Sequence, residues 1–155
     1  MIFRRSKISK FMKTYSHTQN GALIIGVTLS LFVILFSLGL FVLKPFLITA
    51  PLLLLAGWIF HSLTIEVGDG ALRWRFGPGL VSKSVGLSEI ASVKIVRTNF
   101  FEGWGIHLSR FGWLYNVSGY DAVAVTLKSG KQFALGTDEP QALADAINMS
   151  RREEI

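Results

Sequence analysis

The sequence predicts a membrane α-helical hairpin followed by a mainly β domain of about seven antiparallel strands with one C-terminal helix. Three observations predict this fold class. Two uncharged apolar runs follow each other, Gly21 to Leu43 and Phe46 to about His61. From Leu63 onward, short segments alternate apolar and polar residues, which is the period of half-buried strands. Residues 139–150 then carry apolar residues at helical spacing.

The first apolar run is long enough to cross a bilayer. As a helix, its 23 uncharged residues span roughly 34 Å, against a hydrocarbon core of about 30 Å. The second run is marginal at 16 residues and gains length if its helix continues through Ser62 and Leu63. A cleavable signal peptide fits poorly, because its apolar region is typically about 7 to 15 residues long. We therefore expect a transmembrane hairpin over residues 21–62, turning at Lys44-Pro45.

Positive charge is concentrated before the first span. The net charge is +6, and five of the cations precede residue 20: Arg4, Arg5, Lys7, Lys10 and Lys13. From Leu63 onward ten basic residues balance ten acidic ones, so the domain gives no electrostatic reason to expect nucleic acid as a partner. The positive-inside rule predicts a multi-pass protein of the cell (inner) membrane with both termini in the cytoplasm.

Residues 1–20 are expected to form a basic cytoplasmic tail. As a helix the tail would be partly amphipathic and could lie on anionic lipid; as a disordered segment it would only set the orientation. In the first span, Ala22, Gly26 and Ser30 recur every four residues, a spacing that lets helix backbones approach closely. This face could pack against the second span of the same hairpin or against another membrane helix.

The domain is expected to begin at residue 63 with a β-hairpin. Leu63 to Val67 and Leu72 to Phe76 alternate on either side of Gly68-Asp69-Gly70, where glycine permits a tight turn. Further strands are predicted by alternation at residues 81–87, 91–96, 106–108, 113–117, 123–128 and 131–135. Asp138 and Gln141 form a plausible capping pair for the helix over residues 139–150.

Several glycine-aromatic segments carry a family resemblance: Glu102 to Ile106, Gly112 to Gly119, and Val125 to Lys131 leading into Gly136 to Pro140. The chain resembles bacterial membrane proteins in which a pleckstrin-homology-like (PH-like) domain follows two transmembrane helices. The resemblance implies a bent sheet, or barrel, whose open end is covered by the C-terminal helix. It implies little about activity, since the motifs are turns and not reactive groups.

Two sets of residues are candidates for binding. Arg73-Trp74-Arg75 matches half of the pattern by which eukaryotic PH domains hold phosphoinositides, but Glu66 and Asp69 occupy the region that should supply the lysine. Arg73 and Arg75, like the cations of the tail, are therefore candidates for contact with anionic lipid. The aromatic region 100–120, with Trp104, Trp113 and Tyr115, could be core, membrane interface or a partner surface.

We find no catalytic or metal-binding motif, and expect neither enzyme activity nor a cofactor. The three histidines lie in separate regions, the paired glycines lack the third glycine of a dinucleotide loop, and the chain contains no cysteine. The sequence thus predicts a membrane-anchored PH-like binding or scaffolding module with a protein partner or a second copy of itself. The alternatives are an accessory subunit of a larger membrane complex and an anionic-lipid-binding domain.

Overall fold

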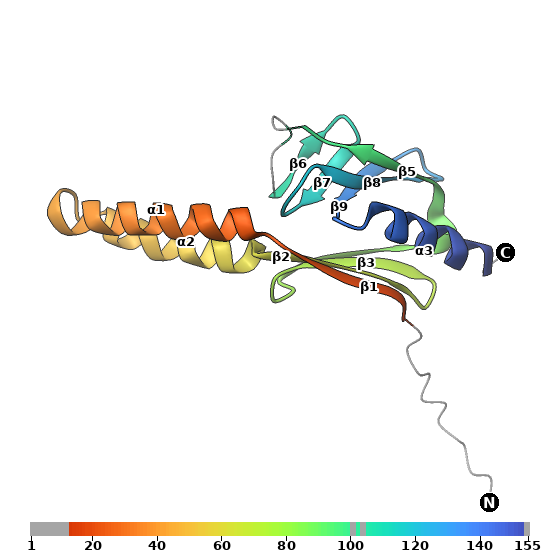
Figure 1. Cartoon of the computed structure of the whole chain (residues 1–155), viewed down its shortest axis with the longest axis horizontal. Coiled ribbons are helices and arrows are strands. Elements are labelled where there is room, and N and C mark those ends of the chain that lie inside the picture. The colour runs from red at the N-terminus through yellow and green to blue at the C-terminus, as the bar shows by residue number, and fades with distance from the viewer. Residues whose placement is uncertain (1–12, 100–101, 103–104, 154–155) are drawn as a thin grey trace, which may run out of the picture.

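The computed structural model describes residues 13–99, 102 and 105–153 (Figure 1). A short strand precedes two long helices, and a domain of strands ends in a third helix. In chain order the elements are β1 (Lys13–Asn20), α1 (Ala22–Phe41), α2 (Phe46–Phe60), β2 (Ser62–Gly68), β3 (Ala71–Phe76), β4 (Val81–Gly86), the 3-10 turn η1 (Leu87–Glu89), β5 (Ile90–Arg97), β6 (Gly105–Ser109), β7 (Gly112–Asn116), β8 (Asp121–Leu127), β9 (Gln132–Gly136) and α3 (Pro140–Glu153).

The strands form two sheets that enclose the core. The first sheet has the order β1-β2-β3-β4, and the second has the order β5-β8-β9-β7-β6. Every pair is antiparallel except β7 with β9, which is parallel. Helix α3 packs against β1, β2, β5 and β8 and covers one side of the space between the sheets (Figure 1). The predicted mixture of sheet and C-terminal helix is confirmed, and the segments expected as strands coincide with β2 to β9. The structure adds β1, and the β7–β9 pair is parallel instead of antiparallel.

The core follows from the alternation of the strands. Leu63, Ile65 and Val67 of β2 are at most 1% exposed, and Leu72, Trp74 and Phe76 of β3 pack beside them. Leu143 and Ile147 supply the buried stripe of α3. Burying these large side chains is the main favourable term in folding a domain of this size.

The β2–β3 hairpin forms as predicted. Asp69 and Gly70 both have positive φ, at 46° and 70°. Two consecutive positive φ values are the geometry that matches a two-residue turn to the twist of antiparallel strands.

Helices α1 and α2 pack along each other as an antiparallel pair that leaves the domain (Figure 1). Helix α1, with 20 residues, is long and apolar enough to cross a membrane. Helix α2 is shorter, with 15 residues and Pro51 inside it. The expected continuation of this helix through Ser62 and Leu63 is wrong, because both residues already belong to β2.

The N-terminal boundary of the domain also differs from the prediction. Residues 13–20, expected in the tail, form β1 and pair with β2 from Lys13 opposite Gly68 to Asn20 opposite Ser62. The hydroxyls of Thr18 and Thr64 lie 2.9 Å apart across this pair. The strand therefore brings the residues before α1 and the residues after α2 into one domain.

Helix α3 begins at Pro140, a favourable first helical position because proline has no N–H to satisfy there. The predicted capping pair is wrong. The Asp138 carboxylate contacts His17 of β1, and the Gln141 side-chain amide donates to Asp145 at 3.0 Å. The backbone N–H of Glu139 instead donates to the Thr137 hydroxyl at 3.1 Å.

Candidate functional site

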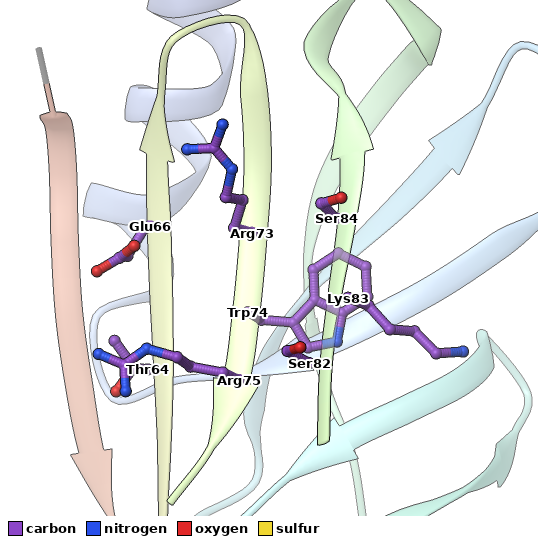
Figure 2. A pocket seen from close by; sticks show the side chains of 8 residues that line it. All are labelled: Thr64, Glu66, Arg73, Trp74, Arg75, Ser82, Lys83 and Ser84. Atoms are coloured by element: carbon purple, nitrogen blue, oxygen red, sulfur yellow. The ribbon is translucent and has the colours of Figure 1, made fainter. Parts of the chain in front are cut away.

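The outer face of the first sheet carries both candidate arginines. Strand register places Thr64, Arg75 and Ser82 in one row, and the next row holds Glu66, Arg73 and Ser84. Figure 2 shows these polar side chains around a shallow hollow of about 310 Å³. Because strand residues alternate between faces, Trp74 lies between the two arginines in sequence but has its side chain in the core.

This face has mixed charge. Glu66 is the register partner of Arg73, while Arg75 is opposite Thr64 and is the more exposed arginine. Arg75 also lies at the end of the sheet nearest the helices, because its partner Thr64 follows shortly after α2. It is close to the β3–β4 turn, where a Cβ added at Gly79 would be 3.7 Å from the Arg75 Cδ. The arrangement can contact a single anionic group at Arg75, and the carboxylate of Glu66 opposes binding of a polyanion.

A larger groove of about 600 Å³ opens between the two sheets. Its lining comes from β3 and β4 on one sheet and from β6, β7, β9 and the end of β8 on the other. Helix α3 packs on β1, β2, β5 and β8, so the groove is on the side of the sandwich that α3 leaves open. Strand β4, at one wall of the groove, is an edge strand of the first sheet, opposite the other edge strand, β1.

The walls of the groove are apolar and partly exposed. Leu108 on β6 and Trp113 on β7 are register partners, and their side chains are 73% and 51% exposed. Val85 of β4 and Phe133 of β9 face the same space. Large apolar side chains that line a concave surface and remain exposed are typical of a binding site.

Trp74 forms the floor of the groove. Its ring is stacked on Phe133 with centroids 4.9 Å apart and makes an edge contact with Tyr115 at 5.3 Å. The indole Nε1 is buried and has no hydrogen-bond partner among the described residues. A buried N–H without an acceptor costs free energy, and such groups in native structures call for an explanation.

Two lysines lie at the rim of the groove. The Lys83 ammonium is 5.4 Å from the centroid of the Tyr115 ring, a cation–π contact, and Lys131 lies in the β8–β9 turn. Neither lysine has a carboxylate partner among the described residues, and the lining contains no acidic residue. The groove is therefore apolar inside and positive at its rim.

The aromatic candidates separate into different roles. Tyr115 is 3% exposed and belongs to the core, whereas Trp113 is half exposed in the groove. Trp104 lies outside the described residues, as do Phe100 and Phe101. Among the candidate cations of the tail, Arg4, Arg5, Lys7 and Lys10 also lie outside them, and Lys13 is the first residue of β1.

The small-residue face of α1 is not what holds α1 and α2 together. A Cβ added at Gly26 would meet no atom within 4 Å, and Ala22 and Ser30 are exposed. The helices approach closely at Gly57, where an added Cβ would be 2.5 Å from Thr28 Cγ2. A second close approach joins Gly39 to Leu47 at the far end of the pair.

One polar cluster could not be expected from the sequence, because it joins β1 to the start of α3. His17 Nε2 lies 2.6 Å from Asp138 Oδ1, and His17 Nδ1 lies 3.4 Å from Glu139 Oε2. The Tyr15 hydroxyl donates to Glu139 at 3.4 Å. Partial burial, and then the Glu139 carboxylate, raise the pKa of Tyr15 to about 12. This cluster fastens β1 to the start of α3.

No group of three or more histidine, aspartate or glutamate side chains within residues 13–99, 102 and 105–153 could hold a metal ion. In comparisons with known proteins, no family model, no curated protein and no solved structure matches the chain. The groove, the apolar helices and the arginine face are therefore the features on which a function can be argued.

Proposed function

We propose that this protein is a membrane-anchored, non-catalytic PH-like module that captures a segment of a partner protein on the cytoplasmic side. The observation that carries the proposal is the groove beside β4, with Leu108 and Trp113 exposed over a floor of packed aromatic rings. A free sheet edge beside apolar pockets is a recurrent way to bind a peptide, since the backbone supplies hydrogen bonds and the pockets supply specificity.

Both helices cross the membrane in this proposal. Large apolar side chains are exposed along α1 and α2, as expected where lipid covers them. Because β1 pairs with β2, the chain enters α1 and returns from α2 on one side of the bilayer. Helix α2 spans only about 22 Å, so the bilayer thins locally or the turn at residues 42–45 completes the crossing.

The cytoplasmic orientation is supported by the distribution of positive charge. Five cations precede residue 20, whereas the turn between the helices holds Lys44 alone. The PH-like description is supported by two facing sheets with a C-terminal helix on one open side. The nine described strands are two more than the roughly seven of the simple PH-like pattern, and the parallel β7–β9 pair is a further difference from it.

The test is capture of the full-length protein from gently solubilised membranes, followed by mass spectrometry and native-gel sizing. We expect a stoichiometric protein partner that is lost when Leu108→Ser and Trp113→Ser are combined. The matched control is Ile95→Ser, an exposed apolar residue of β5 outside the groove, which should retain the partner. Equal recovery of the partner with the unsubstituted protein, the Leu108→Ser, Trp113→Ser double variant and the Ile95→Ser variant would contradict the proposal.

A second candidate, the accessory subunit of a larger membrane complex, is favoured by the outward small-residue face of α1. The open space at Gly26 would admit a helix of another protein at close range. In that case Gly26→Leu, and not the groove substitutions, should release an integral-membrane partner in the same capture experiment.

A further inference from the structure

The chemistry of the groove indicates what kind of segment it binds, if the proposed function holds. Four features bear on this: the free edge of β4, the apolar walls, the charge at the rim and the unpaired indole N–H. Each narrows the class of ligand.

The free edge of β4 favours an extended polypeptide. In an edge strand, alternate residues direct their N–H and C=O groups away from the sheet, where another strand can pair with them. The six residues of β4 span about 20 Å and include Ser82, Lys83 and Ser84, all exposed. No proline or bulge interrupts this strand, so its free edge is regular along its length.

The rim charge favours an acidic segment. Lys83 projects from β4 itself and Lys131 from the β8–β9 turn across the groove, so an added strand would have a lysine on either side. The same charge disfavours a second copy of this chain. Pairing two β4 strands would bring two Lys83 side chains to one interface, and like charges on neighbouring strands are destabilising.

The floor of the groove favours an oxygen acceptor on the segment. The Trp74 indole is 4% exposed, lines the groove and lacks a partner among the described residues. Because this nitrogen is fully covered, a carbonyl or carboxylate oxygen that enters beside Lys83 would accept from the N–H only once the side chains above it shift; the bond would then remove the cost of leaving it unpaired.

We propose that the groove holds an extended, acidic segment of a partner protein, added to the free edge of β4 as a further strand of the first sheet. Only every second side chain of such a strand faces the groove; within that set, carboxylates meet Lys83 and Lys131 and apolar side chains pack on Leu108 and Trp113. This inference rests on the proposed function, because it specifies the ligand of the same groove.

A library of random linear peptides displayed on phage tests the ligand class. The library is selected on the full-length protein in nanodiscs of phosphatidylcholine. We expect enriched peptides to carry both acidic and apolar residues within one set of every-second positions, the set that faces the groove. Selection on the chain with Lys83→Glu and Lys131→Glu should enrich basic peptides instead. The control Lys94→Glu changes an exposed lysine on β5, outside the groove, and should leave the acidic preference unchanged.

The outcomes separate this inference from the proposed function. Neutral or basic peptides that still require Trp113 would overturn the acidic ligand but leave a peptide-binding groove. If no enriched peptide depends on Trp113 for binding, both the acidic ligand and the peptide-binding groove would be overturned.

Strand addition has its own readout: an enriched peptide should slow amide hydrogen exchange at residues 81–86 at least tenfold. Slowing confined to β6 would overturn the β4 assignment, and self-association that is abolished when Leu108→Ser and Trp113→Ser are combined would identify a second copy as the occupant.

Discussion

Glycines at positive φ determine where strands of the second sheet come close together. A Cβ added at Gly112 would collide with the backbone carbonyl of Gln132, whereas one at Gly130 would meet no atom within 4 Å. Both residues have positive φ, at 82° and 84°. An alanine would therefore suffer the backbone strain of a positive φ at either position, but would collide with a neighbouring strand only at Gly112.

We therefore expect Gly130→Ala to lower the free energy of unfolding by about 1 kcal/mol, from the φ penalty alone. Gly112→Ala should lower it by about 3 kcal/mol or more, since β9 must also move away. Chemical unfolding of the detergent-solubilised protein, followed by tryptophan fluorescence, measures the difference. Equal losses would mean that β7 and β9 do not pair as described.

Tyr15 makes stability depend on alkaline pH. Burial and the Glu139 carboxylate raise the pKa of Tyr15 to about 12, from an ordinary value of about 10. The folded state thus holds this proton more tightly than the unfolded state, and the stabilisation is complete below about pH 10. It should disappear as the pH rises from about 10 through about 12. Tyr15→Phe should show a smaller alkaline loss in thermal unfolding, and an identical loss would contradict the cluster at β1.

The sequence could predict the faces of individual residues but not their surroundings. Alternation places Trp113 and Tyr115 on the same face of one strand, yet Tyr115 is buried and Trp113 is half exposed. The difference arises because Tyr115 packs against Trp74 of the other sheet, while Trp113 lies at the beginning of β7 and lines the open groove. Whether a strand residue is covered depends on the position of the other sheet, which the local sequence pattern does not indicate.

Among the elements, α1 and α2 approach each other most closely at Gly57, with a second close approach at Gly39. Gly57→Leu should force α2 away from Thr28 and lower the thermal stability of the hairpin, at a cost of about 1 to 3 kcal/mol for overpacking. Gly26→Leu is the control, because that position faces open space. Thermal unfolding in a mild detergent should separate the two variants. If Gly26→Leu were the more damaging change, the helices would pack through the face first expected from the small-residue spacing.

The strand most difficult to predict was β1. Its alternation of Tyr15, His17 and Gln19 with smaller polar residues is short and lies directly after a basic segment. Its partner β2 follows only after the whole helix pair, so nothing local indicates the pairing. The β2–β3 hairpin, in contrast, has both strands and its turn within 15 residues, from Ser62 to Phe76, and was predicted correctly.

At the scale of the whole molecule, β1 and the proposed hairpin fix the topology. The chain contains no cysteine, so single cysteines can report on each side of the membrane. We expect Lys44→Cys, between the helices, to react with a membrane-impermeant maleimide added to spheroplasts. Ser129→Cys, in the exposed β8–β9 turn, should react only after lysis. Labelling of Ser129→Cys in intact spheroplasts would reverse the orientation, and protection of Lys44→Cys would argue against a crossing hairpin.

Site-specific photocrosslinking in living cells distinguishes a partner held in the groove from a partner held by the helices. A photoreactive amino acid replaces Trp113 in the groove or, in a second strain, Gly26 on the outward face of α1. We expect position 113 to crosslink to one defined segment of a partner protein and position 26 to give no protein adduct. Crosslinks from position 26 to an integral-membrane protein, with none from position 113, would contradict the binding module and make this chain a subunit held by its helices.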